Sequence, residues 1–270
     1  MRTFIALLGT LLSTGPLQAQ LALNPNPTRV LGHLWVTPKS SAPNLVEGRE
    51  FYGPHAIAVD RSATPPILYI SDTGNNRVLA WRDISKAREG VTADRVIGQR
   101  DKFSTSIWGP GTGYRSGMYR PTGLAVDAQG NLYVVDTGNN RILRFPKPFE
   151  QLEDALAPDL VIGQTSLDTN APNAGGRSNR SIAVNLGGDR LYRTSLAFDS
   201  QGNLYFTDTG NNRVVRYPSY NLAPGAPHGP TADMVLGQVD FENDIVPKTV
   251  DAQALLNKNY VPAPAGLAFS

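Results

Sequence analysis

Asp72-Thr73-Gly74-Asn75-Asn76-Arg77 is the most informative segment of the chain for its fold, because it occurs three times without change. The other copies are Asp136–Arg141 and Asp208–Arg213, so successive copies start 64 and 72 residues apart, from 72 to 136 and from 136 to 208. Recurrence at intervals of this size indicates one supersecondary unit that is repeated along the chain. A residue present in every copy is therefore expected to serve the scaffold.

Short apolar runs at matching positions around each turn predict four strands per repeat. The first strand, with small and branched residues, is predicted at 54–60, 121–127 and 193–199, and another copy of it starts at 264. The second strand, rich in aromatic and branched residues, is predicted at 68–71, 132–135 and 204–207. The third follows the turn at 77–81, 141–145 and 213–217, and the fourth is predicted at 96–99, 161–164 and 235–238.

Four antiparallel strands per copy, joined by short turns, describe a blade of a β-propeller better than a sandwich or a solenoid. The predicted fold class is thus all-β, with propeller blades at about 50–99, 120–164 and 191–238 and the start of the next at 264. About three blades plus partial ones make an incomplete ring, because propellers have about four to eight. We therefore expect the chain to be truncated at its C-terminus.

The N-terminal segment, residues 20–49, contains one further match to the repeat. Val30-Leu31-Gly32-His33 resembles the fourth strand, yet no first, second or third strand precedes it. An orphan outer strand at the start of a chain is what a ring needs if its last blade is completed by the N-terminus, which hides the open strand edges.

Residues 1–19 have the pattern of an export signal. Arg2 supplies a positive start, 4–12 is an apolar run, and Leu17-Gln18-Ala19 is a cleavage site before Gln20. The apolar run is too short to span a bilayer, and nothing later is long and apolar enough to do so. The protein is therefore expected to be exported, to the periplasm or outside the cell, without a transmembrane segment.

Composition excludes several classes of site. The chain has no cysteine, which excludes disulfides, thiolate zinc sites and cysteine catalysis. Its net charge is only +2, and the 25 basic residues are spread along the chain, so nucleic acid is not expected as a partner. Proteins, peptides and glycans remain as candidate ligands.

The repeat resembles the NHL repeat in four features taken together. These are the first strand, the Asp-x-x-Gly-Asn turn after it, the stretch Leu-Tyr-x-x-Asp-Thr-Gly-Asn-Asn-Arg and the aromatic end of the third strand. The aromatic residues are Trp81, Phe145 and Tyr217. The resemblance covers most of residues 50–270 and implies a propeller of the exported bacterial type. Such propellers include enzymes, extracellular sensor domains, RNA-binding modules and docking surfaces, so the fold does not choose the function. The Asp-rich loops of lactonase-type propellers and the basic face of RNA-binding members are not evident here.

Strand direction places the repeated turns on the same rim as the connections from each fourth strand to the next first strand. These connections, at 100–120, 165–192 and 239–263, exceed about fifteen residues, a length at which loops are more often functional. Ligand contacts are therefore predicted on this rim. The candidate residues are His55, Thr122, Thr194, Trp108 and Tyr114.

The repeated turns themselves are predicted to be structural. Each aspartate is expected to accept hydrogen bonds from amides of its own turn, each glycine to adopt positive φ, and each arginine to reach carbonyls or an acidic group of a neighbouring blade. The residues concerned are Asp72, Asn76, Arg77, Asp136, Asn140, Arg141, Asp208, Asn212 and Arg213. A ring of their oxygens around calcium is the alternative, but six or more oxygens would have to meet at one point.

His55 breaks the repeat, because the equivalent positions hold Thr122, Thr194 and Ala265. A histidine there could bind a metal or move protons. A three-histidine zinc site, like that of the peptidyl-amidating lyases, would also need His33 and His228, whose predicted positions do not converge. We expect no cofactor and no metal residue; calcium or zinc would be the alternative, but no motif supports either.

A binding scaffold for a protein, peptide or glycan is the leading functional interpretation, with no catalytic residue assigned. No Ser-His-Asp order, phosphate loop or paired-carboxylate motif is evident. The alternative is a propeller enzyme, either a peptidyl-amidating-lyase-like metalloenzyme or a lactonase-like hydrolase, with its site at the channel mouth. A third interpretation is an architectural segment of a larger surface protein.

Overall fold

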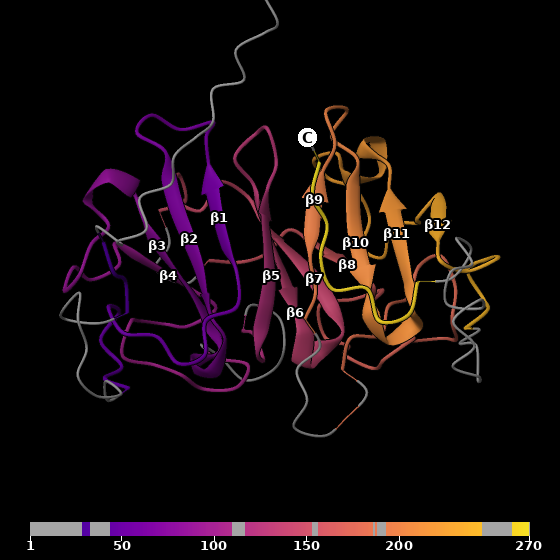
Figure 1. Ribbon diagram of the computed structural model, residues 1–270, viewed down its shortest axis with the longest axis horizontal. Helices are drawn as coiled ribbons and strands as arrows, with labels where there is room; N and C mark the ends of the chain where they lie inside the picture. Colours follow the sequence, from indigo (N-terminus) through magenta and orange to yellow (C-terminus); the bar gives the residue numbers. More distant parts are fainter. Residues whose placement is uncertain are drawn as a thin grey trace, which may run out of the picture.

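The computed structural model describes residues 29–32, 44–109, 117–152, 156–185, 187, 193–244 and 261–269. Within these residues, twelve strands form three four-stranded antiparallel sheets. The sheets lie side by side, from indigo through magenta to orange in Figure 1. The predicted all-β architecture of propeller blades is confirmed. The predicted export signal at 1–19, His33 and Tyr114 lie outside the described residues.

The three blades share one strand order, in which each strand pairs with the next along the chain. The first blade contains β1 (Ile57–Asp60), β2 (Ile67–Asp72), β3 (Arg77–Trp81) and β4 (Arg95–Ile97). The second contains β5 (Pro121–Val126), β6 (Leu132–Asp136), β7 (Arg141–Phe145) and β8 (Leu160–Ile162). The third contains β9 (Leu196–Phe198), β10 (Leu204–Asp208), β11 (Arg213–Tyr217) and β12 (Met234–Leu236).

Short 3₁₀ helices occupy connections between strands. The repeated turns form η1 (Thr73–Asn75), η3 (Thr137–Asn139) and η4 (Thr209–Asn211). Two further helices, η2 (Ile84–Lys86) and η5 (Ser219–Leu222), lie in connections between the third and fourth strands of a blade. The repeated turns and these connections therefore lie at opposite ends of the antiparallel strands.

The predicted fourth strands are shorter than the sequence pattern suggested. Each was expected to include a Gly-Gln pair, but β4, β8 and β12 end at the residue before the glycine. Gly98, Gly163 and Gly237 have φ of 86°, 86° and 88°, a left-handed conformation that glycine adopts without steric cost and that ends the extended backbone. The predicted strand starting at 264 is also absent, because none of the described residues pairs with 264–269.

Apolar side chains between neighbouring sheets form the core. Tyr69 and Val78 of the first blade pack in one cluster with Leu132, Val134 and Phe145 of the second. An equivalent cluster joins the second blade to the third. Because both faces of the second sheet are buried in this way, its strands are apolar on both sides, as strands covered on two faces must be.

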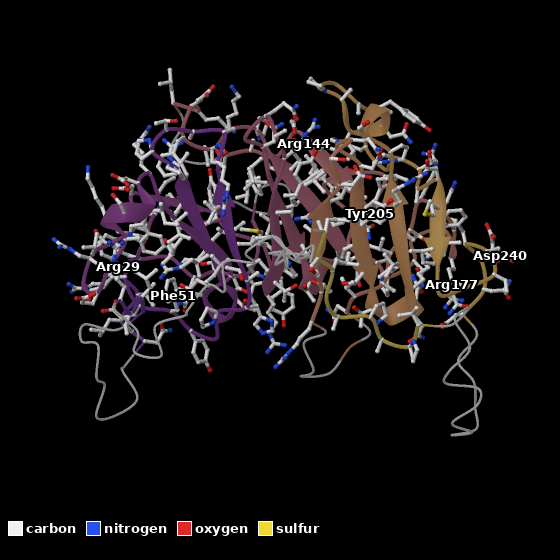
Figure 2. The ribbon with its side chains drawn as sticks, turned by 45° about the horizontal axis from the view of Figure 1, so that its top comes forward. Arg29, Phe51, Arg144, Arg177, Tyr205 and Asp240 are labelled. Carbon is white, nitrogen blue, oxygen red and sulfur yellow. The ribbon has the colours of Figure 1, made fainter. Side chains whose placement is uncertain are left out.

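The opposite face of the first sheet has a cluster of its own but no neighbouring sheet among the described residues. Leu68, Ile70 and Trp81 are buried there, with Phe51 packed against them. A cavity of about 520 Å³ opens beside this cluster, and its lining includes Arg29 and Phe51, both labelled in Figure 2. The side chains on this face are apolar, like those that pack between neighbouring blades elsewhere in the molecule.

Residues 29–32 adopt the conformation that ends a fourth strand. Gly32 has a φ of 87°, matching the glycines after β4, β8 and β12. It forms a parallel bridge with Glu50, as Gly163 does with Ser181. This geometry agrees with the predicted orphan outer strand. Closure of a ring by this segment remains a prediction.

Glu50 is a buried carboxylate at a position that Ser181 occupies in the equivalent bridge. Among the described residues, neither of its carboxylate oxygens accepts a hydrogen bond, and Arg49 Nε lies 3.3 Å from Oε1. Burial raises the pKa of the Glu50 carboxyl above its ordinary value. The native state then binds more protons than the unfolded chain, so stability falls as pH rises from the ordinary pKa to the raised one.

Glu50→Gln is therefore expected to increase the free energy of unfolding at pH 7, because the buried charge is removed while the shape of the side chain is kept. Urea unfolding at pH 4.5 and pH 7 should show a larger benefit at the higher pH. Glu150→Gln is the control, since the Glu150 side chain is 70% exposed, and we expect it to change stability by less than about 0.5 kcal/mol. A loss of stability in Glu50→Gln at pH 7 would contradict the prediction.

Candidate functional site: the rim of the repeated turns

Each repeated turn is held by a buried ion pair between its first and last residues. Arg141 Nε donates to Asp136 Oδ2 at 2.7 Å, and both side chains are 0% exposed. The same distance separates Arg77 from Asp72 and Arg213 from Asp208. Strand pairing places the two residues opposite each other at the end of each hairpin. The arginines were predicted to reach carbonyls or an acidic group of a neighbouring blade. They do donate to carbonyls, those of Lys102, Leu167 and Ser181, but their acidic partner lies in their own turn.

The second carboxylate oxygen of each turn binds the chain segment that enters the same blade. Asp72 Oδ1 accepts from the N–H of Tyr52, Asp136 Oδ1 from that of Tyr119, and Asp208 Oδ1 from that of Ala183, at 2.7, 2.7 and 2.9 Å. The prediction that backbone amides of the turn itself donate to the aspartate is therefore wrong. Within the turn the donor is the side-chain amide of Asn75, Asn139 or Asn211, at 2.9, 2.8 and 2.7 Å. The carboxylate connects segments distant in sequence, which local patterns do not reveal.

Positive φ in each turn belongs to asparagine and not to glycine, in contrast to the prediction. Asn76, Asn140 and Asn212 have φ of 55°, 50° and 52°. Asparagine tolerates the left-handed region better than most residues. The glycines are needed for close approach, because a Cβ on Gly138 would lie 2.2 Å from the ring of Tyr119.

The asparagine that ends each turn also binds the segment that enters the next blade, and the threonine of the first turn does the same. Asn76 Oδ1 accepts from the N–H of Arg120 at 2.9 Å, and Thr73 Oγ1 donates to the carbonyl of Pro121 at 2.6 Å. Each turn therefore fixes the start of the following blade as well as its own.

The third turn holds the C-terminal described segment in the same way. Asn212 Oδ1 accepts from the N–H of Ala263 at 2.9 Å, and Thr209 Oγ1 donates to the carbonyl of Pro264 at 2.7 Å. Tyr205 meets Phe269 edge to face with 4.9 Å between ring centroids, as Tyr133 meets Phe198 at 5.0 Å. Residues 261–269, yellow beside β9 and β10 in Figure 1, therefore lie where the entry to a blade is expected.

The turns and the long connections share one rim, as predicted. Arg77 Nη1 donates to the carbonyl of Lys102, and Gln99 Nε2 donates to the carbonyl of Ser106, both in the first long connection. Figure 2 places Arg177, in the second long connection, low on the right, whereas Arg144 lies on the upper side. These hydrogen bonds hold the first long connection against the strands of the first blade.

Two of the predicted ligand residues have buried hydroxyl groups. The Thr122 side chain is 1% exposed, and its Oγ1 lies 2.5 Å from Thr137 Oγ1 and 2.7 Å from Thr194 Oγ1. Trp108 is half-buried, and its Nε1 donates to Asn139 Oδ1 at 3.0 Å. These contacts link neighbouring blades, so all three residues have a structural role whether or not a ligand also contacts them.

His55 is exposed at the start of the first strand. Partial burial, together with the positive charge of Arg193, lowers the pKa of the imidazole below its ordinary value. Arg193 directly precedes Thr194 and is itself exposed, and Arg120 lies two residues before Thr122. The structure therefore gathers cationic groups where the first strands begin. Neither arginine was predicted as a ligand residue from the sequence, because both lie next to the first strand without belonging to a repeated motif.

Aromatic rings lie over the turns on the same rim. The Tyr52 side chain covers Gly74, and that of Tyr119 covers Gly138, each at a distance that leaves no room for a Cβ. Tyr52 remains 59% exposed. The guanidinium of Arg120 lies 5.7 Å from the centroid of the Tyr119 ring, within the range of cation–π attraction. The blade entries thus present aromatic and cationic groups together.

The described part of the chain contains no group of three or more His, Asp or Glu side chains arranged to hold a metal ion. His228 Nδ1 accepts from the N–H of Val161 at 3.4 Å, in the connection between β11 and β12. It therefore lies at the rim opposite His55, and the two histidines do not share a site. Among the same residues, no helix has the length and apolarity required to cross a bilayer.

The repeat with this geometry can be assigned to a family. Residues 118–145, which span β5, β6, η3 and β7, match the family model of the NHL repeat. The second blade is an NHL repeat. The first and third blades reproduce the ion pair, the asparagine conformation and the strand order of the matched one. No curated protein matches the chain.

Solved structures that resemble the chain are propeller-like enzymes. A streptogramin B lyase structure shares 13% identity and a TM-score of 0.35, over 71% of this chain and 42% of that one. Virginiamycin B lyase from Staphylococcus aureus shares 15% identity and a TM-score of 0.33, over 62% and 39%. A gluconolactonase from Xanthomonas campestris, XC5397, shares 20% identity and a TM-score of 0.31, over 67% and 40%. The NHL-repeat chain thus spans about two fifths of these structures, and such similarity transfers no activity to it.

Proposed function

We propose that this NHL-repeat protein is an exported scaffold that binds a protein, peptide or glycan through the rim of the repeated turns. Export rests on the signal pattern of residues 1–19. The rim is suited to binding because loops carry the contacts while buried turns hold them in place.

The observation that carries this proposal is the unneutralised positive charge at the blade entries. Arg120 and Arg193 form no ion pair with any of the residues that the structure describes. Partial burial and the charge of Arg193 keep the pKa of His55 below its ordinary value, so His55 adds no positive charge at neutral pH. The two guanidinium groups, which lack an acidic partner, favour an anionic ligand.

A rim variant tests the proposal. A variant with Arg120→Ala and Arg193→Ala is expected to weaken binding of a rim ligand at least about tenfold, because hydrogen bonds to charged groups contribute about 1.5–3 kcal/mol each. Binding would be measured with immobilised mature protein against arrays of peptides and glycans. N-terminal sequencing of the exported chain, expected to start at Gln20, tests its location.

Arg88→Ala is the matched control, because Arg88 is exposed in the connection between β3 and β4 at the opposite rim. Ligands whose affinity changes equally in the control and the rim variant would contradict a rim site. Turnover of a bound ester or peptide, lost in the same rim variant, would instead favour the enzyme alternative.

A further inference from the structure

The rim offers aromatic rings at two blade entries and guanidinium groups at two. Tyr52 lies at the first entry, Tyr119 and Arg120 are adjacent at the second, and Arg193 lies at the third. Tyr52 and Tyr119 are structurally equivalent, since each donates its N–H to the turn aspartate and each covers the turn glycine. A ligand that runs from the first blade to the third therefore meets both rings and both positive charges.

The third blade continues the positive charge without the ring. Ala183 takes the place of the two tyrosines, since its N–H binds Asp208 and its carbonyl accepts from Gly210. Arg193 follows at the start of the first strand of that blade. The hydroxyl contact of 2.7 Å between Thr122 and Thr194 brings the second and third entries together. The second and third entries are therefore adjacent.

We infer that the rim ligand is an acidic glycan, a chain of sugar rings that carry carboxylate groups; this inference rests on the proposed function. Sugar rings present flat C–H faces that pack on exposed aromatic rings such as that of Tyr52. Carboxylates pair with guanidinium groups through charge-assisted hydrogen bonds. A polymer of carboxylated rings repeats both features, as the blade entries do.

Other anionic ligands fit the rim less well. Acidic peptides are usually bound along a free strand edge or in a groove, whereas the groups that this rim exposes are the Tyr52 ring and the guanidinium of Arg193 at the blade entries. Nucleic acids carry a denser charge and depend on many cationic contacts, and the net charge of the whole chain is only +2.

Isothermal titration of the full chain with a galacturonate hexamer tests the inference, with a neutral glucose hexamer as the matched ligand. We expect saturable binding of the acidic hexamer that weakens as salt is raised, and at least about tenfold weaker binding of the neutral one. Arg120→Ala with Arg193→Ala, and separately Tyr52→Ala, should each weaken binding several-fold. Arg88→Ala and Tyr220→Ala, both exposed at the opposite rim, should leave it unchanged.

Other results would test the glycan inference and the proposed rim site separately. Absence of binding to the acidic hexamer, or tighter binding of polyglutamate or a thymidine oligonucleotide, would overturn the glycan inference. If an array peptide then loses affinity in the rim variants, the proposed function still stands. If the hexamer binds equally well to every rim variant, both the inference and the proposed rim site are wrong. Circular dichroism of each variant separates loss of the site from loss of the fold.

Discussion

Replacing Arg141 with Met is expected to lower the free energy of unfolding by about 3–5 kcal/mol, because removal of one partner strands a charge in the interior. Arg141 and Asp136 are both fully buried and lie 2.7 Å apart. The guanidinium also donates to the carbonyls of Leu167 and Gly117, at 2.5 and 3.1 Å. Those carbonyls would lose their donor as well. Urea unfolding followed by tryptophan fluorescence measures the change.

Arg216→Met is the matched control for this prediction. Arg216 lies on the same kind of strand, and its Nη2 is 2.9 Å from Asp233, but the two side chains are 26% and 33% exposed. An exposed ion pair contributes about 1 kcal/mol or less. We therefore expect the control to cost several times less than Arg141→Met. Equal losses in the two variants would mean that burial of the turn ion pair does not govern stability.

Asn140→Ala is expected to cost about 3–5 kcal/mol through two separate effects. The side-chain oxygen accepts from the N–H groups of Val184 and Asn185, at 3.0 and 2.7 Å, and buried donors left without an acceptor cost about 1–3 kcal/mol each. The backbone of Asn140 has a φ of 50°, a conformation that costs a residue such as alanine about 1–2 kcal/mol. Chemical denaturation measures the sum.

Asn140→Gly and Asn140→Asp separate the two effects. Glycine removes the acceptor but adopts positive φ freely, so it should be more stable than the alanine variant by about 1–2 kcal/mol. Aspartate keeps both an acceptor and a tolerance of the left-handed region, so it should lose least. If the alanine and glycine variants lose the same free energy of unfolding, positive φ at position 140 costs alanine nothing, and that half of the prediction is wrong.

Local pattern was enough to predict the repeat, the strand types and the shared rim. The third strand of every blade begins at the arginine and ends at the aromatic residue as predicted, in β3, β7 and β11. This success has a physical reason, since a strand buried between sheets needs a continuous run of branched and aromatic residues. Turn residues then mark where each run stops.

The roles of individual turn residues depended on contacts that no local pattern contains. Asp72 binds the N–H of Tyr52 twenty residues earlier, and Asn76 binds the N–H of Arg120 forty-four residues later. These partners are brought together by the packing of one blade against the next. The prediction of positive φ at the turn glycine was wrong for the same reason. Gly138 is required by the close approach of the Tyr119 ring, a contact that no local pattern shows.

Strand period and turn chemistry are local properties, so the sequence alone predicted four-stranded repeats whose turns and long connections meet at one rim. The side chains that this rim presents depend instead on how separate blades pack together. That packing buries the hydroxyl of Thr122 at 2.7 Å from that of Thr194, although 72 positions separate the two residues. The distance along the chain does not encode such a contact.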